Sequence, residues 1–298
     1  MLLGHQKQLQ YLKRLAQTDK LPHAFLFSGE EKVGKRTTAI EYCKWLLKTD
    51  IEQRTHPDFI LLEPEKREIQ ISQVRDCIWR LALKPQLSVF KIAIIDQAHC
   101  LNQEAQSAFL KTLEEPKGKA LIILITEYSE TLFPTILSRV QRIKFYPPAR
   151  EEIKNYLLKK GIKEDAAQEM IKLSLARPGK IIDFLSKPET LEKQRKAISD
   201  FKSIIGNNLL FRFKCAKELA ANTREIKEVL ESWLGYLREL LISVNHSCQR
   251  EEILLKKDYS LETLKNNINS IQEINFLLAK ANINPRLALE TLMLNLDG

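Results

Sequence analysis

The stretch GEEKVGKRTTA, from Gly29 to Ala39, decides the fold of this chain because it nearly spells a phosphate-binding loop. It matches the pattern G-x-x-x-x-G-K at Gly29, Gly34 and Lys35, directly after the apolar run HAFLFSG, which predicts a buried strand. A helix is expected from about Lys35 to Lys48. In such a loop, backbone N–H groups point at anionic oxygens and the lysine reaches the outer phosphates of a nucleotide. The alternative is an ordinary glycine turn followed by a lysine that begins a helix.

The residue after Lys35 departs from the pattern. A Ser or Thr hydroxyl normally coordinates Mg²⁺ at this position, but the chain has Arg36, whose guanidinium has no acceptor to offer a cation. Thr37 carries a hydroxyl but comes one residue late, about 100° further round the helix. We therefore expect a degenerate site that requires no cofactor, although Gly29, Gly34 and Lys35 still allow weak binding of ATP or ADP.

Further apolar runs alternate with helical patterns in the first half of the chain. Strands are expected at residues 58–64, 90–96 and 120–127, and helices at 71–84 and 102–115. Continuously apolar strands that alternate with helices are typical of a parallel sheet covered on both faces. The predicted fold class is therefore α/β.

The strand at residues 90–96 ends in Asp96, from which a carboxylate can hold Mg²⁺ directly or through water. Motor ATPases of this shape usually place a Glu next, to orient or deprotonate the attacking water, but this chain has Gln97. A carboxamide cannot take the proton. Asp96 alone fits a structural cap equally well. Arg36 and Gln97 together indicate that the chain lacks two groups that hydrolysis needs: a ligand for the metal ion and a residue that activates the attacking water.

A third feature lies in the segment LFPTILSRVQRIKF. Pro134 is predicted to open a short helix, with Ser138 and Arg139 at its end, before the strand IKF. An arginine there has three possible roles: it serves its own nucleotide site, reaches the γ-phosphate of a neighbouring subunit, or solvates a turn. The residues alone leave these alternatives open.

The second half of the chain is predicted to be helical throughout. The pair Pro147-Pro148 marks the clearest domain boundary, because proline continues neither a helix nor a central strand. Beyond it, apolar residues recur at three- and four-residue spacing. We expect a small helical unit from residue 148 to about 190 and a separate helical bundle after it.

Charge and cysteine usage set limits on the function. The net charge of +9 is diffuse: residues 1–147 hold 22 basic and 17 acidic side chains, and residues 148–298 hold 25 and 21. A solvated surface explains this as well as a DNA groove does. No apolar run is long enough to span a membrane and the first segment turns polar after three residues, so we expect a cytoplasmic protein without membrane contact. Five scattered cysteines, without a C-x-x-C pair, argue for reduced thiols rather than zinc or disulfides.

Read together, these segments resemble the AAA+ subunits of the bacterial DNA polymerase III clamp loader. The segments that carry the resemblance are LPHAFLFSG, GEEKVGKRT, IIDQAH, FLKTLEEP, PTILSR and NPRLALETLML. It covers almost the whole chain, and LEEP and ILSR are more specific than the phosphate loop. The resemblance implies an AAA+ P-loop domain at residues 1–147, a helical lid at 148–198 and a helical collar at 199–298 that assembles a pentameric ring.

Within this family, Arg36 and Gln97 make the chain similar to the non-hydrolysing stator rather than to the motor. The family's Ser-Arg-Cys motif, here Ser138-Arg139-Val140, supplies an arginine finger to the ATP of the adjacent motor subunit. Lys180 falls near the lid position where active relatives carry a second phosphate-sensing arginine. The implied partners are the gamma or tau motor subunits, a delta subunit and, through the complex, the sliding clamp and primer-template DNA. The chain would then be a component of the polymerase III holoenzyme without ATPase activity of its own.

Two other functions remain open from the sequence. One is an active, motor-type AAA+ ATPase with a variant phosphate loop, in which Thr37 or water completes the magnesium shell. The other is a stand-alone DNA-binding module, against which the even spread of charge argues. Many relatives also insert a four-cysteine zinc module after the loop helix. Here only Cys43 lies in that region, so no zinc is expected.

Overall fold

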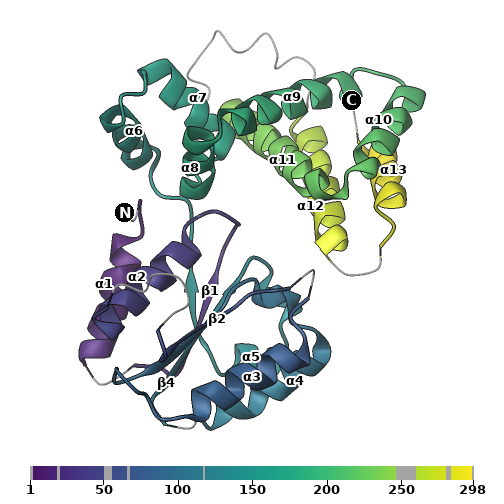
Figure 1. Cartoon of the computed structure of the whole chain (residues 1–298). Helices are drawn as coiled ribbons and strands as arrows, with labels where there is room; N and C mark the ends of the chain where they lie inside the picture. The colour runs from purple at the N-terminus through teal and green to yellow at the C-terminus, as the bar shows by residue number, and fades with distance from the viewer. Residues whose placement is uncertain are drawn as a thin grey trace. The chain divides into compact units, whose positions relative to one another are not determined.

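The computed structural model describes residues 3–18, 21–49, 56–65, 68–116, 118–245, 260–279 and 283–296. The chain divides into two compact units (Figure 1). The first comprises residues 1–160 together with 177–179, and the second comprises 161–176 together with 180–298. None of the helices in the described ranges is long and apolar enough to cross a membrane.

The first unit contains a five-stranded, wholly parallel sheet with the strand order β2-β3-β4-β1-β5. Its elements are α1 (Gln6–Gln17), β1 (Ala24–Ser28), α2 (Lys35–Leu47), β2 (Phe59–Leu62), α3 (Ile71–Ala82), β3 (Lys91–Ile95), α4 (Gln103–Glu114), β4 (Ala120–Thr126), α5 (Pro134–Leu137), β5 (Gln141–Lys144) and α6 (Arg150–Lys159). The predicted α/β fold is confirmed. The strands and helices expected before residue 128 are all present, and their ends differ from the expectation by one or two residues.

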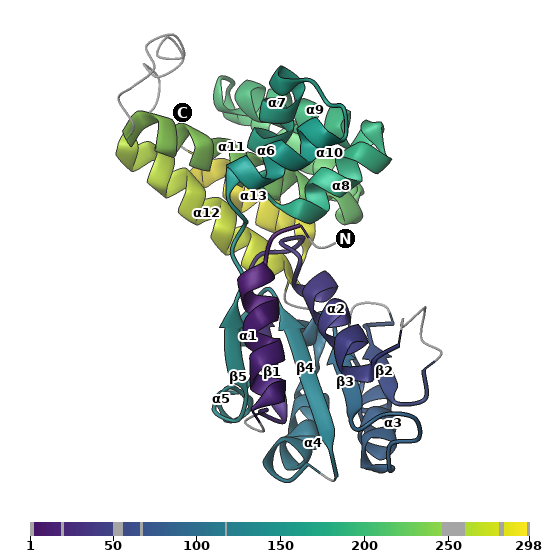
Figure 2. The same ribbon diagram turned by 90° about the vertical axis from the view of Figure 1, so that its left-hand side faces the viewer.

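The central strands are continuously apolar because both of their faces are buried. Along β1, Ala24 and Leu26 pack into one core with residues of α3 and α4, whereas Phe25 and Phe27 pack into a second core with residues of α1 and α2. Figure 2 shows α1 and α2 lying across one face of the sheet. Because all the strands run in the same direction, their carboxyl ends lie at one edge of the sheet, which we call the carboxyl edge. The opposite edge is called the amino edge.

The second unit is helical, as the apolar spacing predicts. It contains α7 (Glu164–Ser174), most of α8 (Pro178–Ser186), α9 (Pro188–Ile205), α10 (Leu209–Ala221), α11 (Thr223–Asn245), α12 (Leu261–Ala279) and α13 (Pro285–Asn295). Its core includes Trp233, which is fully buried and donates a hydrogen bond from Nε1 to the backbone oxygen of Ala197 at 2.9 Å. Helix α9 runs without a break through residues 198 and 199, where lid and collar were expected to meet. The division into three domains stays a prediction.

Candidate functional site

The segment between β1 and α2 forms a tight loop at the carboxyl edge. Gly29 has φ 149°, and a Cβ at this residue would lie 2.3 Å from the backbone oxygen of Phe145, so a side chain does not fit. Gly34 has φ 109° and caps the amino end of α2. The His5 ring donates from Nε2 to the backbone oxygen of Val33 at 2.7 Å. The backbone shape expected of a phosphate-binding loop is therefore held by the chain's own contacts.

Lys35 is the first residue of α2 and is buried, with 7% of its surface exposed. Its Nζ donates hydrogen bonds to the backbone oxygens of Gly29 and Glu30, both at 2.6 Å. The ammonium group therefore closes the loop on itself. Two of the three N–H donors of Lys35 are thus used within the loop itself.

Arg36 lies between two carboxylates. Its Nη1 is 2.6 Å from Oε1 of Glu63 and 3.1 Å from Oδ2 of Asp96. Glu63 directly follows β2 and Asp96 directly follows β3, so the parallel sheet brings both to the carboxyl edge, next to the loop. Burial raises the pKa of the Asp96 carboxyl, and the positive charge of Arg36 is the largest influence in the opposite direction. The side chain at the position of the expected magnesium hydroxyl thus forms a bridge between two acids.

The other two residues expected at this site lie beside that bridge. Thr37 is exposed on α2, and Thr38, the next residue, turns inward to donate its hydroxyl proton to the backbone oxygen of Gly34 at 2.9 Å. Gln97 has an exposed side chain, and its backbone N–H donates to Oδ1 of Asp96 at 3.0 Å. Both carboxylate oxygens of Asp96 therefore accept hydrogen bonds from within the chain.

Arg139 follows the short helix α5 and is held by three groups. Its Nη2 lies 2.6 Å from Oε1 of Glu114, and its Nη1 donates to the backbone oxygen of Thr135 at 2.8 Å and to the Ser138 hydroxyl at 3.2 Å. The Ser138 hydroxyl in turn donates to the oxygen of Thr135 at 3.0 Å. The arginine side chain remains 34% exposed, so it is oriented by its neighbours without being enclosed by them.

The strand register separates Arg139 from the phosphate loop. Residue 141 of β5 pairs with Phe25 of β1, so Arg139 comes before the paired part of β5 and lies at the amino edge, whereas Gly29 lies at the carboxyl edge. Figure 2 shows α5 and the start of α2 at opposite ends of the sheet. The five residues of β1, at roughly 3.3 Å each, keep the two ends of the sheet about 15 Å apart. Arg139 therefore lies away from the chain's own loop.

The segment around Lys180 divides between the two units. Arg177 belongs to the first unit, is 3% exposed and lies with its Nη1 3.8 Å from Oε2 of Glu30 in the phosphate loop. Lys180 belongs to the second unit and forms an ion pair with Glu231 at 3.1 Å. Arg177 is therefore a basic residue of this segment that contacts the loop.

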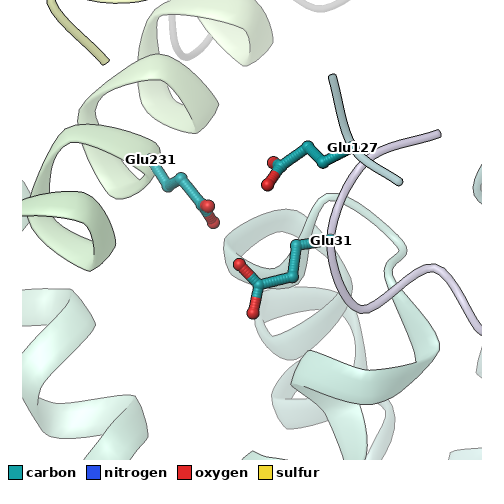
Figure 3. A group of neighbouring side chains, drawn as sticks. All are labelled: Glu31, Glu127 and Glu231. Carbon is teal, nitrogen blue, oxygen red and sulfur yellow. The ribbon is translucent and has the colours of Figure 1, made fainter. Parts of the chain in front are cut away.

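Figure 3 shows three glutamates, Glu31, Glu127 and Glu231, whose carboxylates are of a kind that can bind metal ions. Glu31 and Glu127 belong to the first unit and Glu231 to the second, where it is paired with Lys180. We assign no metal site to this group.

Cys43 is buried in the core of the first unit, where burial raises the pKa of its thiol, and Cys248 lies outside the described residues.

Sequence reasoning missed two side chains of these sites, Glu63 and Glu114. Glu63 belongs to no motif, but an acidic residue directly after a predicted parallel strand was a usable signal. Glu114 is part of LEEP, and its contact with Arg139 joins residues that are 25 positions apart. Only the packing of α4 against α5 brings these two residues together.

The first unit is thus a parallel α/β sheet with a glycine-rich loop between β1 and α2, and comparison with known proteins shows which proteins it is similar to. A family model described as "DNA polymerase III, delta subunit" matches residues 4–149. The delta-prime subunit of Pseudomonas aeruginosa is 34% identical over 134 residues, which are 39% of this chain and 41% of that protein. The delta-prime subunit of Bacillus subtilis is 28% identical over 179 residues, covering 55% and 53%. The gamma subunit of Buchnera aphidicola is 26% identical over 294 residues, covering 89% and 80%.

The matched part of the chain, residues 4–149, is similar to clamp-loader subunits of DNA polymerase III, and two of the relatives are delta-prime subunits. The match spans only about half or less of each delta-prime relative, 41% of one and 53% of the other.

Proposed function

We propose that the chain is a non-hydrolysing stator of the clamp loader, which helps motor subunits load the sliding clamp onto primed DNA. One observation carries the proposal: Arg36 bridges Glu63 and Asp96 at the position where a motor subunit needs a magnesium ligand. Gln97 adds to it, because a carboxamide cannot accept the proton of an attacking water. With neither the metal ligand nor the base, phosphoryl transfer to water lacks the groups that stabilise and activate it.

In this proposal, the chain acts on a neighbour's nucleotide through Arg139. The position of Arg139 at the amino edge supports a role in trans, because an arginine at the opposite end of the sheet from its own loop can face another subunit. A guanidinium placed beside a γ-phosphate stabilises the charge that develops during transfer. The neighbour is a gamma or tau motor subunit, a delta subunit completes the ring, and the clamp and primer-template DNA are reached through the complex.

The similarity to a gamma subunit over 89% of this chain favours a second candidate, an active motor-type ATPase with a variant loop. The two candidates differ in a simple measurement. The isolated chain should show no ATP turnover above background, and the complex with its gamma or tau and delta partners should hydrolyse ATP when clamp and DNA are added. A Lys35-dependent rate near one per second for the isolated chain, typical of a working enzyme, would favour the motor.

A further inference from the structure

The phosphate-binding fold implies a Mg²⁺ ion beside the loop, and the residues present do not fit one. The ion would need an oxygen ligand from position 36 and at least one available carboxylate at the end of β3. Position 36 is an arginine, which offers five N–H donors and no lone pair. The two oxygens of Asp96 already accept from Arg36 and from the backbone N–H of Gln97, and Glu63 is paired with the same guanidinium nitrogen.

We infer that the guanidinium of Arg36 is the resident cation of this site and takes the place of Mg²⁺. A guanidinium is permanently charged and, being attached to α2, is always present beside the two acids. Mg²⁺ would have to give up water molecules, displace this group from Glu63 and Asp96, and find an oxygen at position 36 that is not there. The balance of these effects favours Arg36 over the ion.

The consequence concerns the kind of ligand that the loop accepts. Asp96 and Glu63 would repel a polyphosphate if they were unpaired, and in active sites a divalent ion offsets this repulsion. Here Arg36 offsets it without a metal. The site therefore takes nucleoside di- or triphosphates in their metal-free form, and its affinity for them does not depend on Mg²⁺. This inference deepens the proposed function and rests on its view of the loop as a site without hydrolysis.

Binding of Mn²⁺ to the full chain, followed by electron paramagnetic resonance without nucleotide, tests the inference directly. The wild-type chain should bind no Mn²⁺ that depends on Asp96. Arg36→Ser removes the bridging cation and supplies the missing hydroxyl, so it should gain one Mn²⁺ site, and Arg36→Ser combined with Asp96→Asn should lose it again. Arg75→Ser is the matched control, because Arg75 is an exposed arginine on α3 of the same unit, and its removal should create no site.

Two results would overturn the inference: a wild-type Mn²⁺ site that Asp96→Asn abolishes, or an Arg36→Ser chain that gains none. A titration with a fluorescent ADP analogue adds a second readout. Arg36→Ser should bind the analogue about tenfold more tightly in Mg²⁺ than in EDTA, a difference of about 1.4 kcal/mol. Neither result depends on ATP turnover, so the stator proposal can fail in the reconstituted complex while this inference stands, and the reverse also holds.

Discussion

Arg139 and Glu114 form an ion pair at 2.6 Å that joins the end of α5 to the last residue of α4. The Glu114 carboxylate and the Thr135 carbonyl hold the partly exposed guanidinium in one orientation at the amino edge. An arginine of this kind loses less side-chain freedom when it meets a phosphate than a freely rotating one would.

Replacement of Arg139 by alanine should leave the fold and assembly of the complex intact while slowing its ATP hydrolysis. Arginine fingers contribute roughly 10³ to 10⁵ in rate at the site they serve. The loss for the whole complex should be partial, because the other motor sites receive fingers from other subunits. Arg139→Lys should rescue poorly, since an ammonium lacks the forked donors of a guanidinium. Arg142→Ala, at an exposed position in β5, is the control, and equal rates for wild type and Arg139→Ala would refute the role.

Glu114 is predicted to act only through Arg139. Glu114→Gln should change the free energy of unfolding by less than about 1 kcal/mol, because both side chains of the pair are in partial contact with water. In the reconstituted complex it should lower ATP hydrolysis, by less than Arg139→Ala does. The double variant should be no slower than Arg139→Ala alone, because the two residues would act in series. Additive losses would show that Glu114 has a separate role.

Asp58 is predicted to be a main source of stability in the first unit. Its fully buried carboxylate lies 3.3 Å from Nζ of Lys91 and accepts hydrogen bonds from the backbone N–H groups of residues 86, 87 and 88. Asp58→Asn leaves Lys91 buried without its counter-charge and should lower the free energy of unfolding by about 3 kcal/mol. Asp76→Asn, at an exposed ion pair with Arg80, should change it by less than about 1 kcal/mol. Urea unfolding in a Trp233→Phe background measures this, since the remaining tryptophans, Trp45 and Trp79, both belong to the first unit.

The same carboxylate should make the first unit sensitive to acid. Burial alone would raise the pKa of Asp58, but the hydrogen bonds from residues 86–88 outweigh burial and hold the pKa well below its usual range. A pKa that is lower in the folded than in the unfolded state stabilises the fold above the unfolded value of about 3.9, and that stabilisation is lost as the pH falls further. Asp58→Asn should therefore flatten the dependence of stability on pH below about 4. An unchanged slope would assign the acid sensitivity to other carboxyls.

Two exposed leucines on α13 are predicted to form part of the assembly surface of the second unit. Leu287 and Leu294 are 63% and 59% exposed and lie seven residues apart on one face of the helix, whereas Leu289 and Leu292 are buried in the core. Replacing Leu287 and Leu294 by Glu should abolish co-purification with the gamma or tau and delta subunits without unfolding the unit. Ile182→Glu, at an exposed position on α8, is the control. Stoichiometric assembly of the double variant would place the interface elsewhere. Deleting residues 200–298 would test the assembly role of the second unit less well than these substitutions do. That deletion cuts through α9 and removes the buried Phe201, so the remaining chain could fail to fold.

The sequence predicted the α/β fold because continuously apolar strands alternate with helical patterns, which is typical of a parallel sheet covered on both faces. It also identified Arg36 and Asp96 as residues of one candidate site, Arg36 from its place in the loop motif and Asp96 from its place at the end of a strand. The partners of the two arginines could not be predicted, because Glu63 and Glu114 meet them through the packing of elements distant in the chain. In α13, a leucine recurs at every second or third position from 287 to 294, so the sequence alone does not distinguish the buried pair of leucines from the exposed pair.

The length of β1 and β5 has a consequence for protein engineering. Because these strands keep the phosphate loop and Arg139 at opposite edges of one rigid sheet, each edge can be redesigned without disturbing the other. A chain carrying Arg36→Ser and Gln97→Glu would be a starting point for a variant that hydrolyses ATP. In this variant, Arg139 would still be available to act on the nucleotide of a neighbouring subunit. The sheet thus separates the site that would bind a nucleotide from the arginine that would act on a neighbour's nucleotide. In a ring built from such chains, the number of nucleotide sites that hydrolyse ATP could be changed one at a time.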